Sequence, residues 1–111
     1  MAKNYNFSIY TDILYALDYS NKTMPNSHFN ILDASILCLI KSFNDKKQQF
    51  YMSNKELSTI FLSDPTTIQR SLKRLTSSGL VTSRKEHNGK TPRRYLSYNK
   101  EVIDSLVFNI Y

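Results

Sequence analysis

The stretch SNKELSTIFLSDPTTIQRSLKRLTSSGLVTSRK, residues 53–85, decides the fold of this chain. Ser53 and Glu56 have the spacing of a capping box, in which each side chain satisfies a backbone N–H that the first turn of a helix leaves open. They predict a helix over 54–61, with Leu57, Ile60 and Phe61 on one apolar face.

A second helix is predicted over 64–78, directly after a tight turn. Ser63 is expected to cap it, and the acid and Pro65 that follow suit a first helical turn. Its inward face is expected to consist of Ile68, Leu72 and Leu75. Gly79 is expected to end the helix, because glycine readily adopts the left-handed conformation found there.

A β-hairpin over 80–98 is predicted around Asn88-Gly89, a dipeptide that favours tight turns between strands. If these two residues form the loop, Val81 lies opposite Leu96 and Arg84 lies opposite Arg93. The segment FYM, residues 50–52, is expected to form a short edge strand beside the hairpin.

Helices are predicted on both sides of this central stretch. Apolar residues near helical spacing predict one over 9–19, and the almost wholly apolar ASILCLIKSF predicts a buried helix capped by Asp33. Asn99 is expected to cap a last helix over 100–110. We therefore expect a mainly α fold with a small β-hairpin (α+β), as one domain over 1–111 with its core in 31–98.

The order of these elements, with the quoted stretch, the basic hairpin and RRYLSYN, resembles winged helix-turn-helix domains. It looks like the domains of MarR-type regulators, and is similar to those of replication initiators and replisome organisers of Gram-positive plasmids and phages. The resemblance covers roughly residues 31–98. It implies that 64–78 is a recognition helix, that 80–98 is a wing, and that the protein regulates transcription or acts in replication of a bacterial mobile element.

The basic residues of the chain are concentrated in one block. The net charge is +6, and residues 63–99 hold eight Lys and Arg, including all five arginines, against Asp64 and Glu86. Arginine matches the geometry of phosphate and guanine, so this block favours a nucleic-acid partner.

The exposed face of the predicted recognition helix carries side chains that suit duplex DNA. Polar residues can reach base edges, arginine can read guanine, and other cations can bind phosphates. We expect this face to comprise Thr66, Thr67, Gln69, Arg70, Lys73 and Arg74. An ordinary solvated face is the alternative, but such faces usually mix charges of both signs.

The wing is expected to add contacts to the phosphate backbone from Arg84, Lys85, Lys90, Arg93 and Arg94. Two like charges directly opposite each other destabilise a hairpin. The expected Arg84–Arg93 pair is therefore interpreted as a site that binds an anion between its strands. The alternative is that charged edge residues only prevent aggregation.

Two other functions remain open from the residues alone. Tyr51, Tyr95 and Tyr98 would lie on the small sheet near the arginines, where rings can stack on single-stranded DNA or simply fill the junction with the helices. The chain can also be a protein-interaction module. By resemblance to MarR-type proteins, its terminal helices are expected to build a homodimer.

Nothing in the sequence indicates an enzyme or a cofactor. His28 and His87 have no partners at metal-ligand spacing, and no phosphate-binding glycine loop is present. No pocket for a small molecule is indicated either. The single Cys38 is expected to be buried in a reducing cytoplasmic setting, with no membrane span and no signal peptide. From its Met1 start and apolar end we expect a complete chain.

Overall fold

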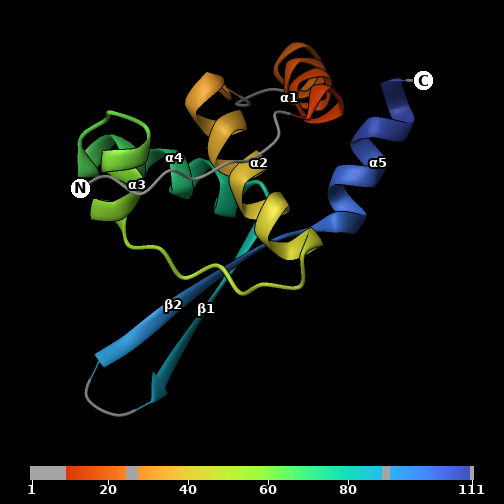
Figure 1. Cartoon of the computed structure of the whole chain (residues 1–111). Helices are drawn as coiled ribbons and strands as arrows, with labels where there is room; N and C mark the ends of the chain where they lie inside the picture. Colours follow the sequence, from red (N-terminus) through yellow and green to blue (C-terminus); the bar gives the residue numbers. More distant parts are fainter. Residues whose placement is uncertain (1–9, 25–27, 89–90, 111) are drawn as a thin grey trace.

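The computed structural model describes residues 10–24, 28–88 and 91–110. Five helices and one two-stranded antiparallel sheet follow each other along these residues (Figure 1). Their bounds are α1 Thr11–Thr23, α2 Ile31–Asp45, α3 Asn54–Ile60, α4 Pro65–Ser77, β1 Val81–Asn88, β2 Thr91–Tyr98 and α5 Lys100–Ile110. The mainly α architecture with a β-hairpin wing is confirmed.

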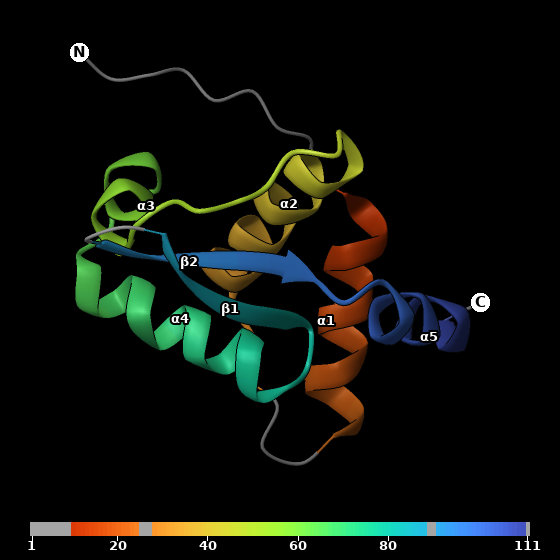
Figure 2. The same cartoon turned by 90° about the horizontal axis from the view of Figure 1, so that it is seen from below.

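The wing projects from a body made of helices (Figure 1). The base of the sheet lies between α2, which contacts β2, and α4, which contacts β1, as Figure 2 shows. On the other side of the body α1 packs against α2 and α5. The buried apolar residues form one cluster to which α1–α5 and both strands contribute. The helix-turn-helix segment and the terminal helices thus share a core.

The ends of α3 and α4 follow local rules of capping. The predicted capping box of Ser53 and Glu56 is confirmed. The cap of α4 is Asp64 and not Ser63: its carboxylate accepts a hydrogen bond from the Thr67 N–H at 2.9 Å, and Pro65 begins the helix. Gly79 follows the last turn with φ +81°, as predicted.

Helices α1 and α2 begin at other residues than expected. The structure places α1 at Thr11–Thr23 rather than 9–19. Helix α2 begins at Ile31, and its cap is Asn30 rather than Asp33. Asp33 is the third residue of the helix and forms a capping box with Asn30, so the acid of this motif stands inside the first turn.

The register of the wing differs from the sequence prediction by two residues. Asn88 pairs with Thr91, so positions 89 and 90, which lie outside the described residues, connect the strands. Arg84 therefore lies opposite Tyr95, and Val81 lies opposite Tyr98. Since side chains alternate between faces with a period of two, a shift by two keeps Leu96 on the core side.

The segment 50–52 forms only one bridge to the sheet. Phe50 pairs with Leu96 of β2, and the Leu96 N–H donates to the Phe50 carbonyl at 2.9 Å. The predicted edge strand is thus reduced to a single bridge. Phe50 is fully buried and meets Phe43 of α2 edge to face, so the core holds this segment beside β2.

Candidate nucleic-acid interface

Helix α4 has one buried and one exposed face. Ile68, Leu72 and Leu75 are buried as predicted, together with Ser71. Of the residues expected to face DNA, four on this helix are exposed, and they are Thr66, Gln69, Arg70 and Lys73. The sequence pattern therefore identified correctly which side of α4 faces the solvent.

The first turn of α4 holds Asp64 in a structural role. Its carboxylate accepts both the N–H and the hydroxyl of Thr67, the latter at 3.1 Å. The Thr67 backbone N–H holds the pKa of Asp64 below its usual value. The Thr67 hydroxyl is thus engaged within the protein, whereas Thr66 is exposed beside it.

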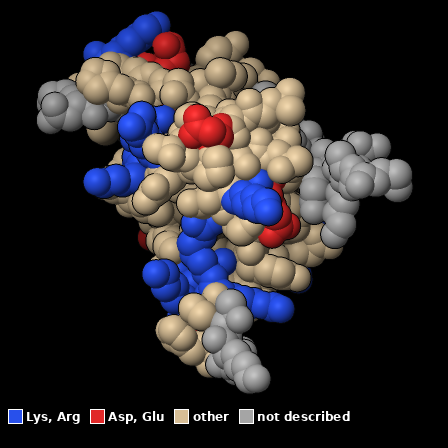
Figure 3. All heavy atoms as spheres, turned by 90° about the vertical axis from the view of Figure 1, so that its left-hand side faces the viewer, with Lys and Arg blue, Asp and Glu red and all other residues tan. Residues whose placement is uncertain are grey.

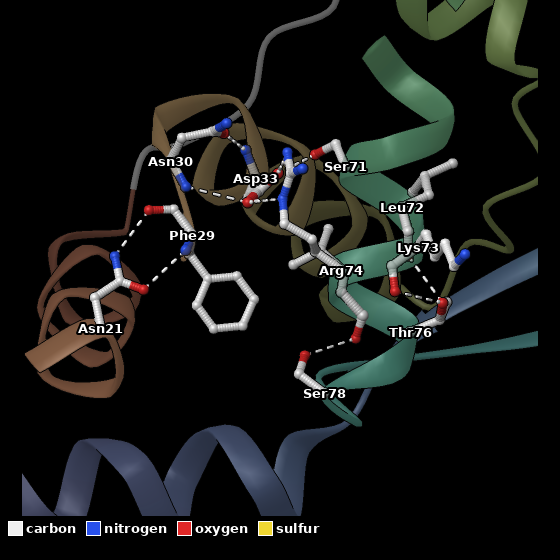
Figure 4. Close-up of polar contacts among 11 residues, drawn as sticks. Asn21, Phe29, Asn30, Asp33, Ser71, Leu72, Lys73, Arg74, Thr76 and Ser78 are labelled. Atoms are coloured by element: carbon white, nitrogen blue, oxygen red, sulfur yellow. Dashed lines mark hydrogen bonds and ion pairs between the residues drawn. The ribbon is translucent and has the colours of Figure 1, made fainter. Parts of the chain in front are cut away.

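Arg74 points into the protein rather than toward the solvent face of α4 (Figure 4). Its guanidinium forms two hydrogen bonds of 2.9 Å with the carboxylate of Asp33, which is fully buried in α2. The Ser71 hydroxyl donates to the same carboxylate. The hydrogen bonds from Arg74 to Asp33 raise the pKa of the arginine. Arg74 therefore fixes α4 on α2.

Asp33 is the important residue that the sequence prediction placed in a different role. It was expected to be a helix cap, and its pairing with Arg74 was not foreseen. The available signal was an acid at the start of a helix that is apolar and buried from Ile36 to Ile40. Buried carboxylates need a partner of opposite charge, and the nearest excess of cations is in 63–99.

Arg94 also points inward, from β2 of the wing. Its guanidinium donates to Asn54 Oδ1 at the start of α3 and to the carbonyl of Met52, each at 2.7 Å. Its Nε is buried without a hydrogen-bond partner, and burial lowers the pKa of the side chain. Arg94 connects the wing to α3 and presents little of its charge to a ligand.

The outer face of the wing does not contain the expected clash of arginines. Arg84 forms an ion pair of 2.9 Å with Glu86 and lies over the ring of Tyr95, 4.9 Å from its centre. Arg93 lies opposite Glu86 and over the ring of Tyr51 at 5.0 Å. The predicted pairing of Arg84 with Arg93 is therefore wrong, because the register shift pairs each with another residue, and the argument for an anion between them loses its premise.

The remaining cations are spread over the wing and the adjacent body. Lys85 is exposed on β1, and Lys90 lies outside the described residues. Lys and Arg side chains gather around the wing at the bottom of the view in Figure 3 and continue along one edge of the body. Tyr98, in contrast, belongs to the junction: its hydroxyl donates to Asp45 at 3.0 Å, and Lys41 lies over its ring.

An apolar cavity of about 590 Å³ lies where the C-terminal half of α4 meets α1 and α5. Its lining includes Arg70, Lys73 and Arg74 of α4, with Phe29 and Leu106 among the apolar residues. The sequence did not indicate this cavity, because its walls come from four separate segments. Within the described ranges, no group of three or more His, Cys, Asp or Glu is placed to hold a metal, and no helix is long and apolar enough to cross a membrane.

Comparisons with known proteins agree with this geometry. Residues 32–81 match the family model of a helix-turn-helix domain. A search of curated proteins gives no match.

Similar solved structures include proteins of three organisms. A protein of the archaeon Sulfolobus tokodaii is 24% identical, with a TM-score of 0.56 over 88% of this chain and 82% of that one. A possible transcriptional regulator of Methanosarcina mazei is 17% identical, with a TM-score of 0.57 over 99% and 86%.

The third is a homodimeric winged helix-turn-helix DNA-binding domain of Mycobacterium bovis, a possible ArsR-family regulator. It is 20% identical, with a TM-score of 0.50 over 97% of this chain and 85% of that one. Residues 32–81 are thus similar to a helix-turn-helix domain, and with β1 and β2 the chain has the winged helix-turn-helix fold.

Proposed function

We propose that this protein binds duplex DNA, with α4 in the major groove and the wing beside it on the phosphate backbone. The observation that carries the proposal is the composition of the exposed face of α4. It presents Thr66, Gln69, Arg70 and Lys73, and the one acid at its start, Asp64, is occupied as the helix cap. A recognition helix meets base edges with its N-terminal part, where these residues stand.

The exposed residues of α4 divide into two roles. Thr66 and Gln69 can hydrogen-bond to base edges, and Arg70 can bind guanine through two hydrogen bonds. Lys73 lies one turn further along and suits a phosphate. Thr67 and Arg74 act indirectly in this proposal, because they fix the start of α4 and its seat on α2.

The wing contributes affinity more than sequence choice. Lys85 is exposed, and Arg84 and Arg93 remain accessible beside their aromatic partners. Lys90, which lies outside the described residues, belongs to the proposed contact by its place in the sequence between Asn88 and Thr91. Each phosphate neutralised by these cations releases counterions, so the affinity is expected to fall steeply with salt. Arg94 holds the wing in position.

The proposed biological role is regulation of transcription, or a replication function on a bacterial mobile element, without catalysis. The neighbours described as transcriptional regulators favour the first role. The resemblance of roughly residues 31–98 to replication initiators and replisome organisers favours the second.

A homodimer through α1 and α5 is part of this proposal. These helices pack on each other at the end of the chain's body away from the wing (Figure 1), and Phe108 on α5 is 80% exposed. A two-fold dimer would place two α4 helices on successive major grooves. Light scattering of the wild type and of Phe108→Asp tests this, and a wild-type mass of one chain would contradict it.

Selection from a randomised duplex library tests the main proposal. A palindrome is the expected product. Arg70→Ala is expected to cost about 1–3 kcal/mol on the selected site and to relax its base preference. Lys73→Ala is expected to weaken all duplexes alike and to reduce the salt slope by about one. Lys46→Ala at the end of α2 is the control. Absence of duplex binding below micromolar concentrations at moderate salt would contradict the proposal.

A further inference from the structure

The outer face of the wing carries two aromatic rings, Tyr51 and Tyr95, that the proposed duplex contact does not use. Tyr51 and Tyr95 meet at 5.9 Å between ring centres, with planes inclined by 63°. Tyr51 is 53% exposed although it adjoins the core. An exposed ring loses the stabilisation that burial provides, so folding alone gives little reason for it.

Two arginines frame these rings. Arg84 lies over Tyr95 and Arg93 lies over Tyr51, so cation, ring, ring and cation follow one another across the face. Arg84, Arg93 and Tyr95 lie on the same side of the sheet, because Arg84 pairs with Tyr95 and Arg93 is two positions from Tyr95. Tyr51 reaches this side through its contacts with Tyr95 and Arg93. The other side of the sheet holds Leu96 in the core and Arg94 against α3.

A groove of about 480 Å³ continues this surface toward the base of the wing. Tyr95 and Arg84 form part of it, and the amides of Gln48 and Gln49 and the hydroxyls of Thr82 and Ser97 lie along it. Three kinds of group therefore adjoin one another. They are rings that can stack on bases, cations that can bind phosphates, and amides that can donate to and accept from base edges.

We propose that this outer face of the wing binds single-stranded nucleic acid, with bases stacked on Tyr51 and Tyr95. Arg84 and Arg93 contact the phosphates between the stacked bases, and the groove takes a further base. Bases in a duplex have their faces covered by their neighbours, so only an unpaired strand can use these rings. This site is separate from the exposed face of α4.

Glu86 limits this binding in the free protein. Its carboxylate holds Arg84 at 2.9 Å and stands opposite Arg93, so it occupies cations that a phosphate would bind. A bound strand must therefore displace or share this ion pair. Removal of the negative charge is expected to tighten single-strand binding.

Fluorescence anisotropy of a labelled oligodeoxynucleotide, and of an oligoribonucleotide of the same sequence, measures the proposed binding by the full chain. Tyr51→Ala is expected to lower the affinity for the single strand at least about 5-fold, which corresponds to one lost stacking contact. Tyr51→Phe keeps the ring and is expected to bind like the wild type. Glu86→Gln is expected to bind more tightly. The oligonucleotide that the wild type binds more tightly shows whether the ligand is single-stranded DNA or RNA.

The α4 variants separate this site from the duplex site. Lys73→Ala is expected to weaken duplex binding and to leave single-strand affinity within about twofold. The inference is overturned if folded Tyr51→Ala, checked by its thermal melting, retains single-strand affinity within about twofold. It is also overturned if Lys73→Ala and Tyr51→Ala reduce single-strand binding equally. Either result leaves the duplex proposal to be judged by its own selection experiment.

Discussion

Helix α4 and the wing are both candidates for DNA contact, but they are attached to the body in different ways. Helix α4 buries an apolar face, and Arg74 joins it to the fully buried carboxylate of Asp33. The outer part of the wing is joined by the ring contact of Tyr51 with Tyr95 and by Arg94. Arg94 makes two hydrogen bonds, to Asn54 of α3 and to the Met52 carbonyl, and leaves its Nε without a partner. The base of the wing is held by Tyr98 and Asp45 near the surface.

In both regions, arginines that are close in the sequence have opposite roles: one is exposed and the other is bound within the protein. Arg70 and Arg74 are one turn apart on α4, yet the first is exposed and the second pairs with Asp33. Arg93 and Arg94 are neighbours on β2 and point to opposite faces. In each region one arginine positions the element that presents the other.

The largest effect is expected from Asp33→Ala. The substitution leaves the Arg74 guanidinium without its buried partner and removes half of the capping box of α2, so unfolding in urea should show a loss of about 3–5 kcal/mol. Asp18→Ala, which breaks the exposed ion pair with Lys22 on α1, is the control and should cost below about 1 kcal/mol. Equal losses in the two variants would show that the Asp33 contact does not anchor α4.

A smaller loss of stability is expected from Arg94→Met. Methionine keeps most of the apolar stem but leaves Asn54 Oδ1 and the Met52 carbonyl without their donor, which should cost about 1–2 kcal/mol. The loss should appear as faster hydrogen exchange in β2, with α4 unchanged, because the contact joins the wing alone. Lys85→Met, at the exposed cross-strand neighbour, is the matched control. Faster exchange in α4 as well would mean that the wing and α4 open together.

Local signals in the sequence were sufficient for most of the helices. The capping box at Ser53, the buried positions of α4 and the glycine after it follow from spacing and backbone preference alone. The sequence could not distinguish Asp64 from Ser63 as the N-cap of α4, because both residue types are favoured at that position.

Such local signals could not predict which residues distant in the sequence pair in the folded protein. Asn88-Gly89 indicated a turn but not its register, and a shift by two residues preserves the alternation that the sequence displays. Arg74 and Arg94 were indistinguishable from the exposed arginines, because their partners lie about forty residues away along the chain. The cavity beside α4 likewise depends on segments that only the fold brings together.

The smallest effect is expected at the base of the wing, and it depends on pH. The hydrogen bond from Lys41 and the Tyr98 hydroxyl lower the pKa of Asp45 below its usual value, against the opposite effect of burial. Because the folded-state pKa lies below the unfolded one, this stabilisation is present above the unfolded pKa of about 3.9 and is lost as the pH falls through the folded value. Lys41 and Asp45 are both partly exposed, so their ion pair should contribute less than about 1 kcal/mol to the free energy of unfolding.

Asp45→Asn tests this contact, because the amide cannot titrate. Urea unfolding at pH 7 should show the variant slightly less stable than the wild type, and the difference should shrink as the pH falls below about 4. Glu101→Gln on α5 controls for the loss of a surface carboxylate. A difference that stays constant on acidification would mean that the charge of Asp45 does not stabilise the fold, which leaves neutral contacts such as that of the Tyr98 N–H with Asn44 at 3.0 Å to hold the base of the wing. In that case only the attachment of α4 would depend on a charged pair, and the contrast between the two regions would be sharper.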